Sequence, residues 1–264
     1  MAVASANLTV MIKAARKAAR RLIRDFGEVE NLQVSRKGAG DFVSAADRVA
    51  EQTIRDELAR ARPAYGWLGE ESAPEPGTDG LHRWIVDPLD GTTNFLHGLP
   101  HWAISIALER KGKITAAVVY DPAKDEMFTA ERGNGAFVND RRLRVSARRE
   151  MSEMLFATGI PFMTSKHLPR SLTDLSRLMP RVAGVRRFGA AALDLAYVAA
   201  GRYDGYWERG VNRWDIAAGA LLVTEAGGLV REIDHDDADP LETGAVLAAN
   251  AEIADPFQAL LREG

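Results

Sequence analysis

The sequence predicts an α and β fold of stacked layers, with an N-terminal α+β part (residues 1–147) and a C-terminal α/β part (residues 148–264). Three observations support this fold class. Two amphipathic helical patterns open the chain, an antiparallel meander follows, and strands alternate with helices after about residue 150. The 264 residues are 46% hydrophobic, which suits one large domain or two closely packed ones. No flexible linker separates the two parts, so we expect one compact body.

The first part begins with helices predicted at residues 5–26 and 44–62. Ser44 stands where an N-cap is expected for the second helix. In the first helix, apolar residues recur at helical spacing: Leu8, Met11, Ala14, Ala18, Leu22 and Phe26. Basic residues occupy the other face: Lys13, Arg16, Lys17, Arg20, Arg21 and Arg24. We interpret this stretch as a native helix with a solvated basic face, and not as a transit peptide.

Short apolar runs between turn signals predict the strands of the first part. These strands are residues 65–68, 84–86, 103–109, 114–120, 127–130, 136–138 and 143–145. Residues 72–80 form a loop by composition, and Asn139-Asp140 is predicted to turn the chain before the last strand. The four runs between residues 103 and 138 are spaced as an antiparallel meander.

The second part alternates strands and helices, which indicates an α/β arrangement. Strands are predicted at 155–158, 184–187, 203–207, 229–232 and 245–249. Helices are predicted at 168–179, 190–200, 214–226 and 254–262. The Ala-rich helix 190–200 is expected to pack closely against a neighbour.

Composition excludes several classes of protein. The net charge is −3 and the isoelectric point about 6.0, so no overall basic field indicates a nucleic-acid partner. The chain has no cysteine, which excludes disulfides, thiolate metal sites and cysteine nucleophiles. No apolar run approaches the roughly 18 residues of a membrane span, and no secretory signal is recognisable. We therefore expect a soluble cytoplasmic protein.

Residues 87–95 (DPLDGTTNF) carry the richest chemistry in the sequence. A buried strand delivers Asp87, and Pro88 is expected to turn the chain because it cannot continue a strand ladder. Asp87 and Asp90 can then converge on one point, and Gly91 lets the backbone approach a ligand. Thr92 opens a predicted helix whose free N–H groups suit an anion. Carboxylates for cations beside amides for phosphate are what phosphoryl transfer needs.

Further acids follow a strand at Glu70 and open a helix at Asp215. Taken singly, Asp87 and Asp90 would be read as an Asx-turn and Asp215 as a helix cap. Together, hard oxygen ligands without a nearby histidine pair favour Mg²⁺ over zinc. The scattered histidines have no metal-binding spacing and are interpreted as surface or packing residues: His82, His97, His101, His167 and His235.

These segments resemble the inositol monophosphatase family. The resemblance rests on residues 87–95, on 69–72 (GEES) and on 214–228 (WDIAAGALLVTEAGG), in that order and at comparable spacing. Residues 41–47 (DFVSAAD), 121–139 and 189–208 also fit, so the likeness covers nearly the whole chain, and bacterial inositol-1-monophosphatases are most alike. The resemblance implies an αβαβα sandwich of the sugar-phosphatase type, hydrolysis of a small phosphorylated polyol, a homodimer and sensitivity to Li⁺.

The resemblance also implies a set of metal ligands. Two or three Mg²⁺ ions would be held by the Glu70, Asp87, Asp90 and Asp215 carboxylates and the Leu89 carbonyl. One Mg²⁺, on Glu70 and Asp87, would activate a water that Asp47 and Thr92 aim at phosphorus. The second, on Asp87, Asp90 and Asp215, would stabilise the leaving alkoxide. No phosphoenzyme is needed.

The substrate side is likewise implied by the resemblance. The Gly91 and Thr92 amides would hold the phosphate, and Asp90 and Asp215 would also face the substrate. The remaining polyol contacts would be Gly189, Ala190, Ala191 and Glu208, with Glu208 accepting hydrogen bonds from ring hydroxyls. Ala190 stands where many relatives carry serine or threonine, so one hydrogen bond is missing there.

Alternatives within the same fold are histidinol phosphate, fructose 1,6-bisphosphate and 3′-phosphoadenosine nucleotides or NADP. Arg186, Arg187, Tyr203 and Trp207 do not clearly form a nucleotide-binding set. A different class is a non-catalytic regulator that binds RNA or protein through the basic first helix; nucleic acid is neither expected nor excluded. A Rossmann oxidoreductase is rejected, because no G-x-G-x-x-G follows a first strand.

Overall fold

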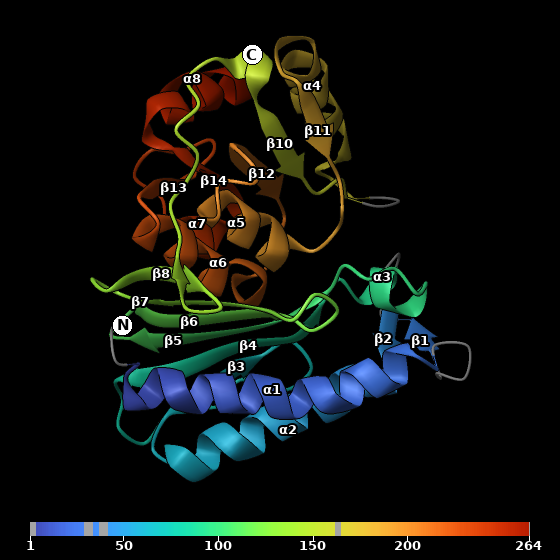
Figure 1. Ribbon diagram of the computed structural model, residues 1–264, viewed down its shortest axis with the longest axis vertical. Helices are drawn as coiled ribbons and strands as arrows, with labels where there is room; N and C mark the ends of the chain where they lie inside the picture. Colours follow the sequence, from blue (N-terminus) through green and yellow to red (C-terminus); the bar gives the residue numbers. More distant parts are fainter. Residues whose placement is uncertain (1–3, 29–33, 37–41, 162–164, 264) are drawn as a thin grey trace.

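The computed structural model describes residues 4–28, 34–36, 42–161 and 165–263. Its elements stack in five layers, αβαβα, which confirms the predicted fold class (Figure 1). Helices α1 and α2 form the first layer, and a seven-stranded sheet covers them. Helices α5 and α6 lie between this sheet and a five-stranded sheet, and α4 and α8 cover the far face. The division of the chain at residues 147 and 148 remains a prediction.

Helices α1 (Ala6–Phe26) and α2 (Ala45–Ala61) pack side by side under the larger sheet (Figure 1). The Ser5 side chain caps α1 by accepting the Leu8 N–H at 3.1 Å. The predicted apolar stripe of α1 is buried, except that Phe26 at its end is only partly buried. Its basic face is partly neutralised, because Lys17 and Lys13 lie 2.5 and 2.9 Å from the Glu57 carboxylate of α2. Ser44 directly precedes α2, and Asp41 lies outside the described residues.

The seven-stranded sheet follows chain order from β3 to β9, with β3 and β4 parallel and every other pair antiparallel. Its strands are β3 (Gly66–Gly69), β4 (His82–Asp90), β5 (Ala103–Arg110), β6 (Lys113–Asp121), β7 (Glu126–Glu131), β8 (Gly135–Val138) and β9 (Arg141–Arg142). The predicted meander is therefore present.

Two predictions in this sheet were wrong. The strand expected at 143–145 lies at Arg141–Arg142 instead, because Asn139 and Asp140 both adopt positive φ and turn the chain within two residues. Pro88 does not end its strand: β4 continues to Asp90, and its pairing with β5 shifts between Asp87 and Asp90. This irregularity accommodates a residue that has no N–H to give the ladder.

The five-stranded sheet has the order β11-β10-β12-β14-β13. Strand β10 is parallel to β11 and β12, whereas β14 is antiparallel to β12 and β13. The strands are β10 (Leu155–Thr158), β11 (Gly184–Arg186), β12 (Gly205–Arg209), β13 (Gly228–Glu232) and β14 (Ala245–Asn250). Strand β12 begins two residues later than predicted, because the Arg202 and Tyr203 N–H groups still donate to the Tyr197 carbonyl at the end of a helix.

Helices α5 (Ala191–Ala199) and α6 (Arg213–Glu225) share one hydrophobic core with both sheets. They approach closely: a Cβ on Gly219 would lie 2.5 Å from the Leu195 Cβ. Helices α4 (Leu168–Leu178) and α8 (Ala251–Arg262) complete the outer layer. None of the helices in the described parts is both long and apolar enough to span a membrane.

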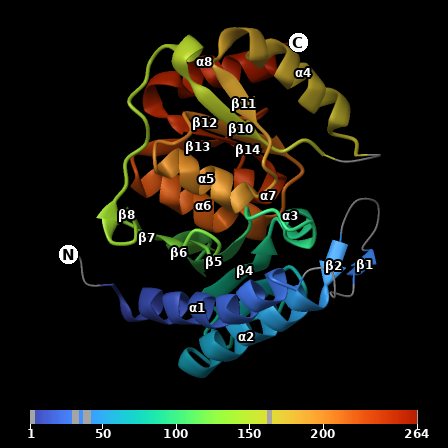
Figure 2. The same ribbon diagram turned by 45° about the vertical axis from the view of Figure 1, so that its right-hand side comes forward.

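Several short elements were not predicted. Strands β1 (Val34–Arg36) and β2 (Phe42–Ser44) pair beyond the ends of α1 and α2 (Figure 2). The others are the helices α3 (Thr92–Leu96) and α7 (Pro240–Thr243) and the 3₁₀ turns Met151–Glu153 and Met179–Arg181, although a helix start at Thr92 was expected. Each is shorter than the window over which hydrophobic periodicity can be read.

Candidate active site

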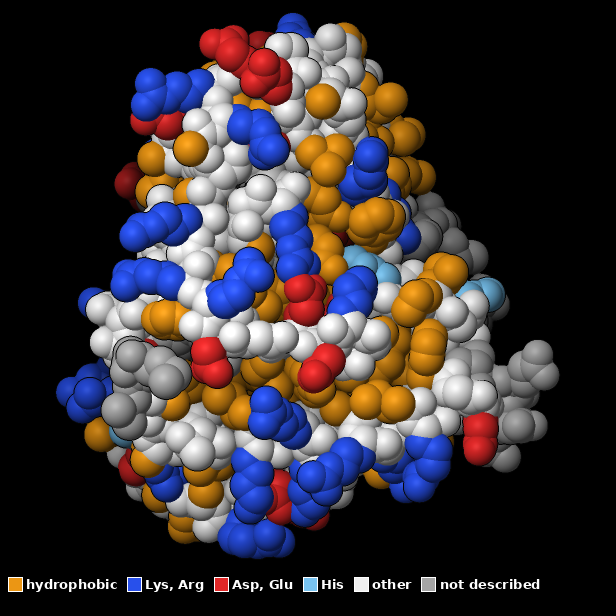
Figure 3. Space-filling view, in the orientation of Figure 1, with side chains coloured by type: hydrophobic (Ala, Val, Ile, Leu, Met, Phe, Trp, Pro, Cys, Tyr) orange, Lys and Arg blue, Asp and Glu red, His pale blue; other side chains and the backbone are white. Residues whose placement is uncertain are grey.

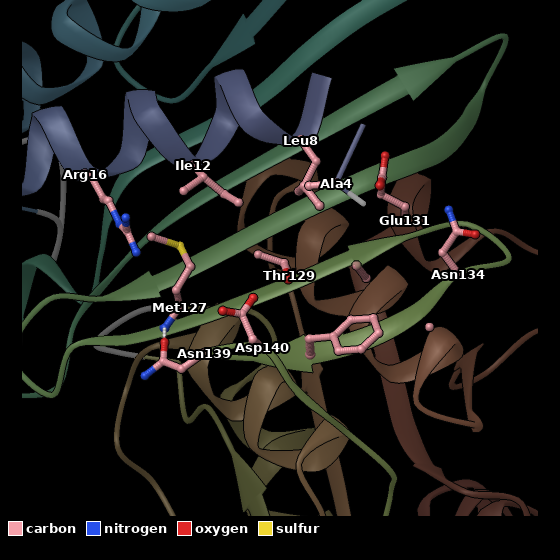
Figure 4. Close-up of a pocket in the computed structure, with 13 residues that line it drawn as sticks. Ala4, Leu8, Ile12, Arg16, Met127, Thr129, Glu131, Asn134, Asn139 and Asp140 are labelled. Atoms are coloured by element: carbon pink, nitrogen blue, oxygen red, sulfur yellow. Dashed lines mark hydrogen bonds between the residues drawn. The ribbon is translucent and has the colours of Figure 1, made fainter. Parts of the chain in front are cut away.

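Two of the cavities in the described parts of the chain differ in chemistry. One, of about 140 Å³, lies between α1 and strands β7 and β8 (Figure 4). Leu8, Ile12 and Met127 give it an apolar lining (Figure 4). Figure 3 shows a band of hydrophobic side chains across the middle of the face turned to the viewer, with Lys and Arg side chains below it. Of its two acids, Glu131 already accepts the Ser5 N–H.

The second cavity, of about 400 Å³, is lined by residues from both sheets and from the helices between them. It contains most of the predicted site: Glu70, Asp87, Leu89, Asp90, Gly91, Thr92, Gly189, Ala191, Glu208 and Asp215. Residues far apart in sequence are thus brought to one place, between the two parts of the chain. Asp47 and Ala190 do not line it.

The irregular end of β4 positions the two central aspartates. Asp87 is 2% exposed and Asp90 is 9% exposed, so both carboxylates are held away from bulk solvent. Gly91 follows with φ of 90°, a left-handed conformation that favours glycine. A Cβ there would lie 3.0 Å from the His101 carbonyl and 3.3 Å from the Ala190 Cβ. The glycine therefore lets β4 turn into α3 against its neighbours.

Each aspartate is held by a backbone N–H through one of its oxygens. Asp87 Oδ1 accepts the Leu89 N–H at 2.9 Å. Asp90 Oδ2 accepts the Ala192 N–H at 2.7 Å, so it caps α5 from the opposite part of the chain. Asp215 Oδ2 accepts the Asn212 N–H at 2.6 Å, as the third residue of a capping box on α6. The Ala191 backbone N–H also forms a hydrogen bond with Asp90, so the start of α5 orients this carboxylate twice.

The acidic groups of this cluster repel one another when charged, and a bound cation would stabilise them. Burial, and then the nearby charges of Glu70, Asp90 and Asp215, raise the pKa of Asp87 well above its ordinary value. Burial likewise raises the pKa of Asp90 to about 7, with Glu208 and Glu70 adding to the effect. Burial and Asp90 raise the pKa of Asp215 well above its ordinary value. Like charges confined together are stable when a metal neutralises them.

The donor set fits Mg²⁺, which prefers carboxylate and carbonyl oxygens. Within the described residues, no three acidic or imidazole groups already stand close enough to hold an ion together. The Leu89 carbonyl also lies in the cavity lining, where it accepts the Thr92 hydroxyl at 2.9 Å.

Asp47 is 2% exposed on the first turns of α2. The expected pairing of Asp47 with Thr92 remains a prediction. Ala190 is fully buried and packs against Gly91, so the structure does not bring it to the polyol side of the cavity.

Sequence reasoning missed several cavity-lining residues: Gly159, Ile160, Pro161, Ser165, His167, Arg187, Arg209, Gly210 and Val211. Arg187 donates to the Ile160 carbonyl at 3.1 Å and sits beside Gly189. His167, interpreted as a surface or packing residue, packs against Gly210 at the cavity wall. Arg209 pairs with buried Asp174 and with Asp234. No local motif marks these positions; the available signal was Arg187, two residues before Gly189.

A layered α and β fold with an acid-lined cavity between its parts defines a class of phosphatases. The chain belongs to the inositol monophosphatase family, whose sequence model matches residues 5–263. It is 57% identical to the inositol-1-monophosphatase of Rhizobium meliloti, over 98% of this chain and 97% of that one. It is 46% identical to a protein of Pseudomonas aeruginosa named Nus factor SuhB, over 96% of this chain and 94% of that one.

Solved structures agree with this assignment. The extragenic suppressor protein suhB of Bartonella henselae superposes with a TM-score of 0.95 at 54% identity, covering 98% of this chain and all (100%) of that chain. The inositol monophosphatase of Anabaena (Nostoc) sp. PCC 7120 superposes with a TM-score of 0.83 at 36% identity, covering 96% and 94%. The predicted family is therefore confirmed, and the chain is an enzyme of the phosphatase class.

Proposed function

We propose that the protein is a Mg²⁺-dependent phosphomonoesterase that hydrolyses inositol monophosphate to inositol and phosphate. One observation carries this proposal: Asp87, Asp90 and Asp215 each bind a backbone N–H with one carboxylate oxygen and line one cavity. That arrangement suits cation binding, and the Rhizobium meliloti relative is named for this activity.

The chain's own groups have distinct roles in this proposal. Glu70, Asp87, Asp90, Asp215 and the Leu89 carbonyl would hold two or three Mg²⁺ ions. When bound, these ions supply charge neutralisation and a water of lowered pKa. The backbone N–H groups at Gly91 and Thr92, where α3 begins, would hold the phosphate oxygens.

Thr92 and Asp47 would orient the attacking water. The Thr92 hydroxyl donates its proton to the Leu89 carbonyl, so its oxygen can accept a hydrogen bond from that water. Asp47 would take the proton that the water loses. Glu208, which lines the same cavity as Gly189 and Ala191, would accept hydrogen bonds from the alcohol.

Arg187 favours one alternative substrate. Arg187 lines the cavity and its charge lowers the pKa of Glu208, so a second anionic group of fructose 1,6-bisphosphate could bind near it. Histidinol phosphate and 3′-phosphoadenosine nucleotides would use the same metal ligands. A regulator that does not hydrolyse esters is a further candidate, since the Pseudomonas aeruginosa relative carries a name that states no enzymatic activity.

The test is phosphate release with and without Mg²⁺ from inositol 1-phosphate, histidinol phosphate, fructose 1,6-bisphosphate and 3′-phosphoadenosine 5′-phosphate. Asp90→Asn should abolish phosphate release. Asp237→Asn, a change at an exposed residue, should leave the rate unchanged. Preference for inositol 1-phosphate supports the proposal, and preference for another ester keeps the reaction and changes the substrate. No release from any ester while Mg²⁺ binds would favour the regulator.

The family resemblance supports three further proposals. The enzyme would form a homodimer, which light scattering of the purified protein measures. It would be inhibited by Li⁺ at constant Mg²⁺. It would act in the cytoplasm, which fractionation of the producing cells can check.

A further inference from the structure

Strand β12 places two side chains of complementary chemistry next to each other. Residues two apart on a strand point to the same face, so Tyr206 and Glu208 stand side by side on the face toward α5 and α6. Tyr206 is fully buried in the core shared by both sheets. Its hydroxyl donates to Glu208 Oε2 at 2.6 Å. Glu208 lines the cavity, whereas Tyr206 does not.

The other side of the Glu208 carboxylate is held by a glycine. A Cβ on Gly159 would lie 1.9 Å from Glu208 Oε1 and 2.1 Å from Oε2, so the carboxylate occupies the space that any other side chain would need. The Gly159 backbone N–H also forms a hydrogen bond with Glu208. Gly159 immediately follows β10, the strand parallel to β12, and Thr158 donates to the Trp207 carbonyl at 2.7 Å.

We infer that Tyr206 and Gly159 are positioning residues that hold the Glu208 carboxylate as a fixed acceptor for an alcohol hydroxyl, and thereby select esters of polyols. This inference rests on the proposed function and adds the residues that set its substrate class. A carboxylate fixed on one side by a phenol and on the other by backbone keeps its remaining lone pairs in one direction. Substrates that present a hydroxyl there gain a charge-assisted hydrogen bond, and esters without hydroxyls gain nothing.

Burial raises the pKa of Glu208, while the Tyr206 hydroxyl, Arg187 and the Gly159 N–H each lower it. Tyr206 therefore also supports the charged form, which accepts hydrogen bonds and does not donate them.

The experiment compares two esters: inositol 1-phosphate, and phenyl phosphate, which has no hydroxyl for Glu208. Tyr206→Phe keeps the ring and removes only the donor. We expect kcat/KM for inositol 1-phosphate to fall about tenfold, mainly through KM, because the loosened acceptor loses part of one charge-assisted hydrogen bond. Phenyl phosphate should be hydrolysed at an unchanged rate.

Gly159→Ala places a methyl group where the carboxylate lies. We therefore expect it to lower kcat/KM nearly as much as Glu208→Gln does, again for inositol 1-phosphate alone. Two matched controls should leave both esters unaffected. Tyr120→Phe removes a remote tyrosine hydroxyl bound to Asp125 at 2.8 Å, and Gly27→Ala adds a methyl group with no atom nearer than 3.4 Å. Thermal unfolding would check that each variant is folded.

The positioning role alone would be overturned if Tyr206→Phe lowered kcat/KM equally for both esters. It would also be overturned if Tyr206→Phe lowered neither value while Glu208→Gln lost the preference for inositol 1-phosphate. A wild-type protein that releases phosphate from neither ester would overturn the proposed function and this inference with it.

Discussion

Replacing Asp90 by asparagine should stabilise the metal-free protein while it abolishes phosphate release. Asparagine has the size of aspartate and keeps an oxygen that can accept the Ala192 N–H, so the cap on α5 survives. What disappears is a charge buried beside other acids. Burial and these neighbours raise the pKa of Asp90 from its ordinary 3.8 to about 7.

The magnitude follows from the linkage between protonation and folding. As pH rises from 3.8 toward about 7, the unfolded chain loses the Asp90 proton before the folded chain does. The unfolded state then binds fewer protons, so the free energy of unfolding falls as pH rises. At 1.36 kcal/mol per pH unit, about three units correspond to at most about 4 kcal/mol, and we expect about 2–4 kcal/mol. The asparagine variant avoids this loss.

Urea unfolding in EDTA at pH 5 and pH 8 measures the effect. The variant should exceed the wild type at both values, and by more at pH 8. Asp237→Asn, an exposed change, should leave the free energy of unfolding nearly unchanged. Added Mg²⁺ should stabilise the wild type more than the variant, because the variant lacks one ligand. A variant that is less stable than the wild type at pH 8 in EDTA would refute the reasoning.

Three further outcomes are expected. Exhaustive dialysis against EDTA should abolish phosphate release and Mg²⁺ should restore it; a full rate after dialysis would contradict the assigned ligands. Burial, and then Lys124, lower the pKa of His101 from 6.5 to about 4, so the wild type should lose stability as pH falls through that interval. Between pH 7 and pH 5 the loss should be about 1 kcal/mol after allowance for solvent screening, and urea unfolding at these two pH values measures it. His101→Phe should remove the loss, and an unchanged pH dependence in this variant would contradict the assignment. Gly219→Ala should lower the free energy of unfolding by about 1–3 kcal/mol, because its methyl group would meet the Leu195 Cβ at 2.5 Å and this outweighs the roughly 1 kcal/mol gained in helix propensity. Urea unfolding measures this, and a raised midpoint would show that α5 and α6 can separate.

Long periodic elements and the site acids were predictable because their signals are local. The apolar stripe of α1 and the meander from β5 to β8 are each indicated by patterns within short stretches of sequence. Glu70, Asp87, Asp90 and Asp215 were recognised as oxygen ligands from motifs, and the structure brings them to one cavity. Their metal-binding roles remain predictions that the experiments above address.

The features that were missed depend on contacts between distant segments. The Asp90 carboxylate caps α5 by accepting the Ala192 N–H. No sequence pattern around either residue predicts this hydrogen bond. Arg187 and Gly159 line the cavity through the register of β10 with its neighbours. Pro88 was expected to end a strand. The shifted pairing with β5 accommodates this proline, and that shift depends on the partner strand, which the local sequence does not indicate.

The bond between Asp90 and the start of α5 has a consequence for the order of assembly. The N-terminal part supplies Glu70, Asp87 and Asp90, but the amide that orients Asp90 and the carboxylate of Asp215 both come from the C-terminal part. A growing chain released only to the end of β9 would carry its acids without the amide that orients Asp90 and without Asp215. Under the proposed function, tight ion binding would therefore arise only when α5 and α6 have docked, so that metal uptake would report this step of folding.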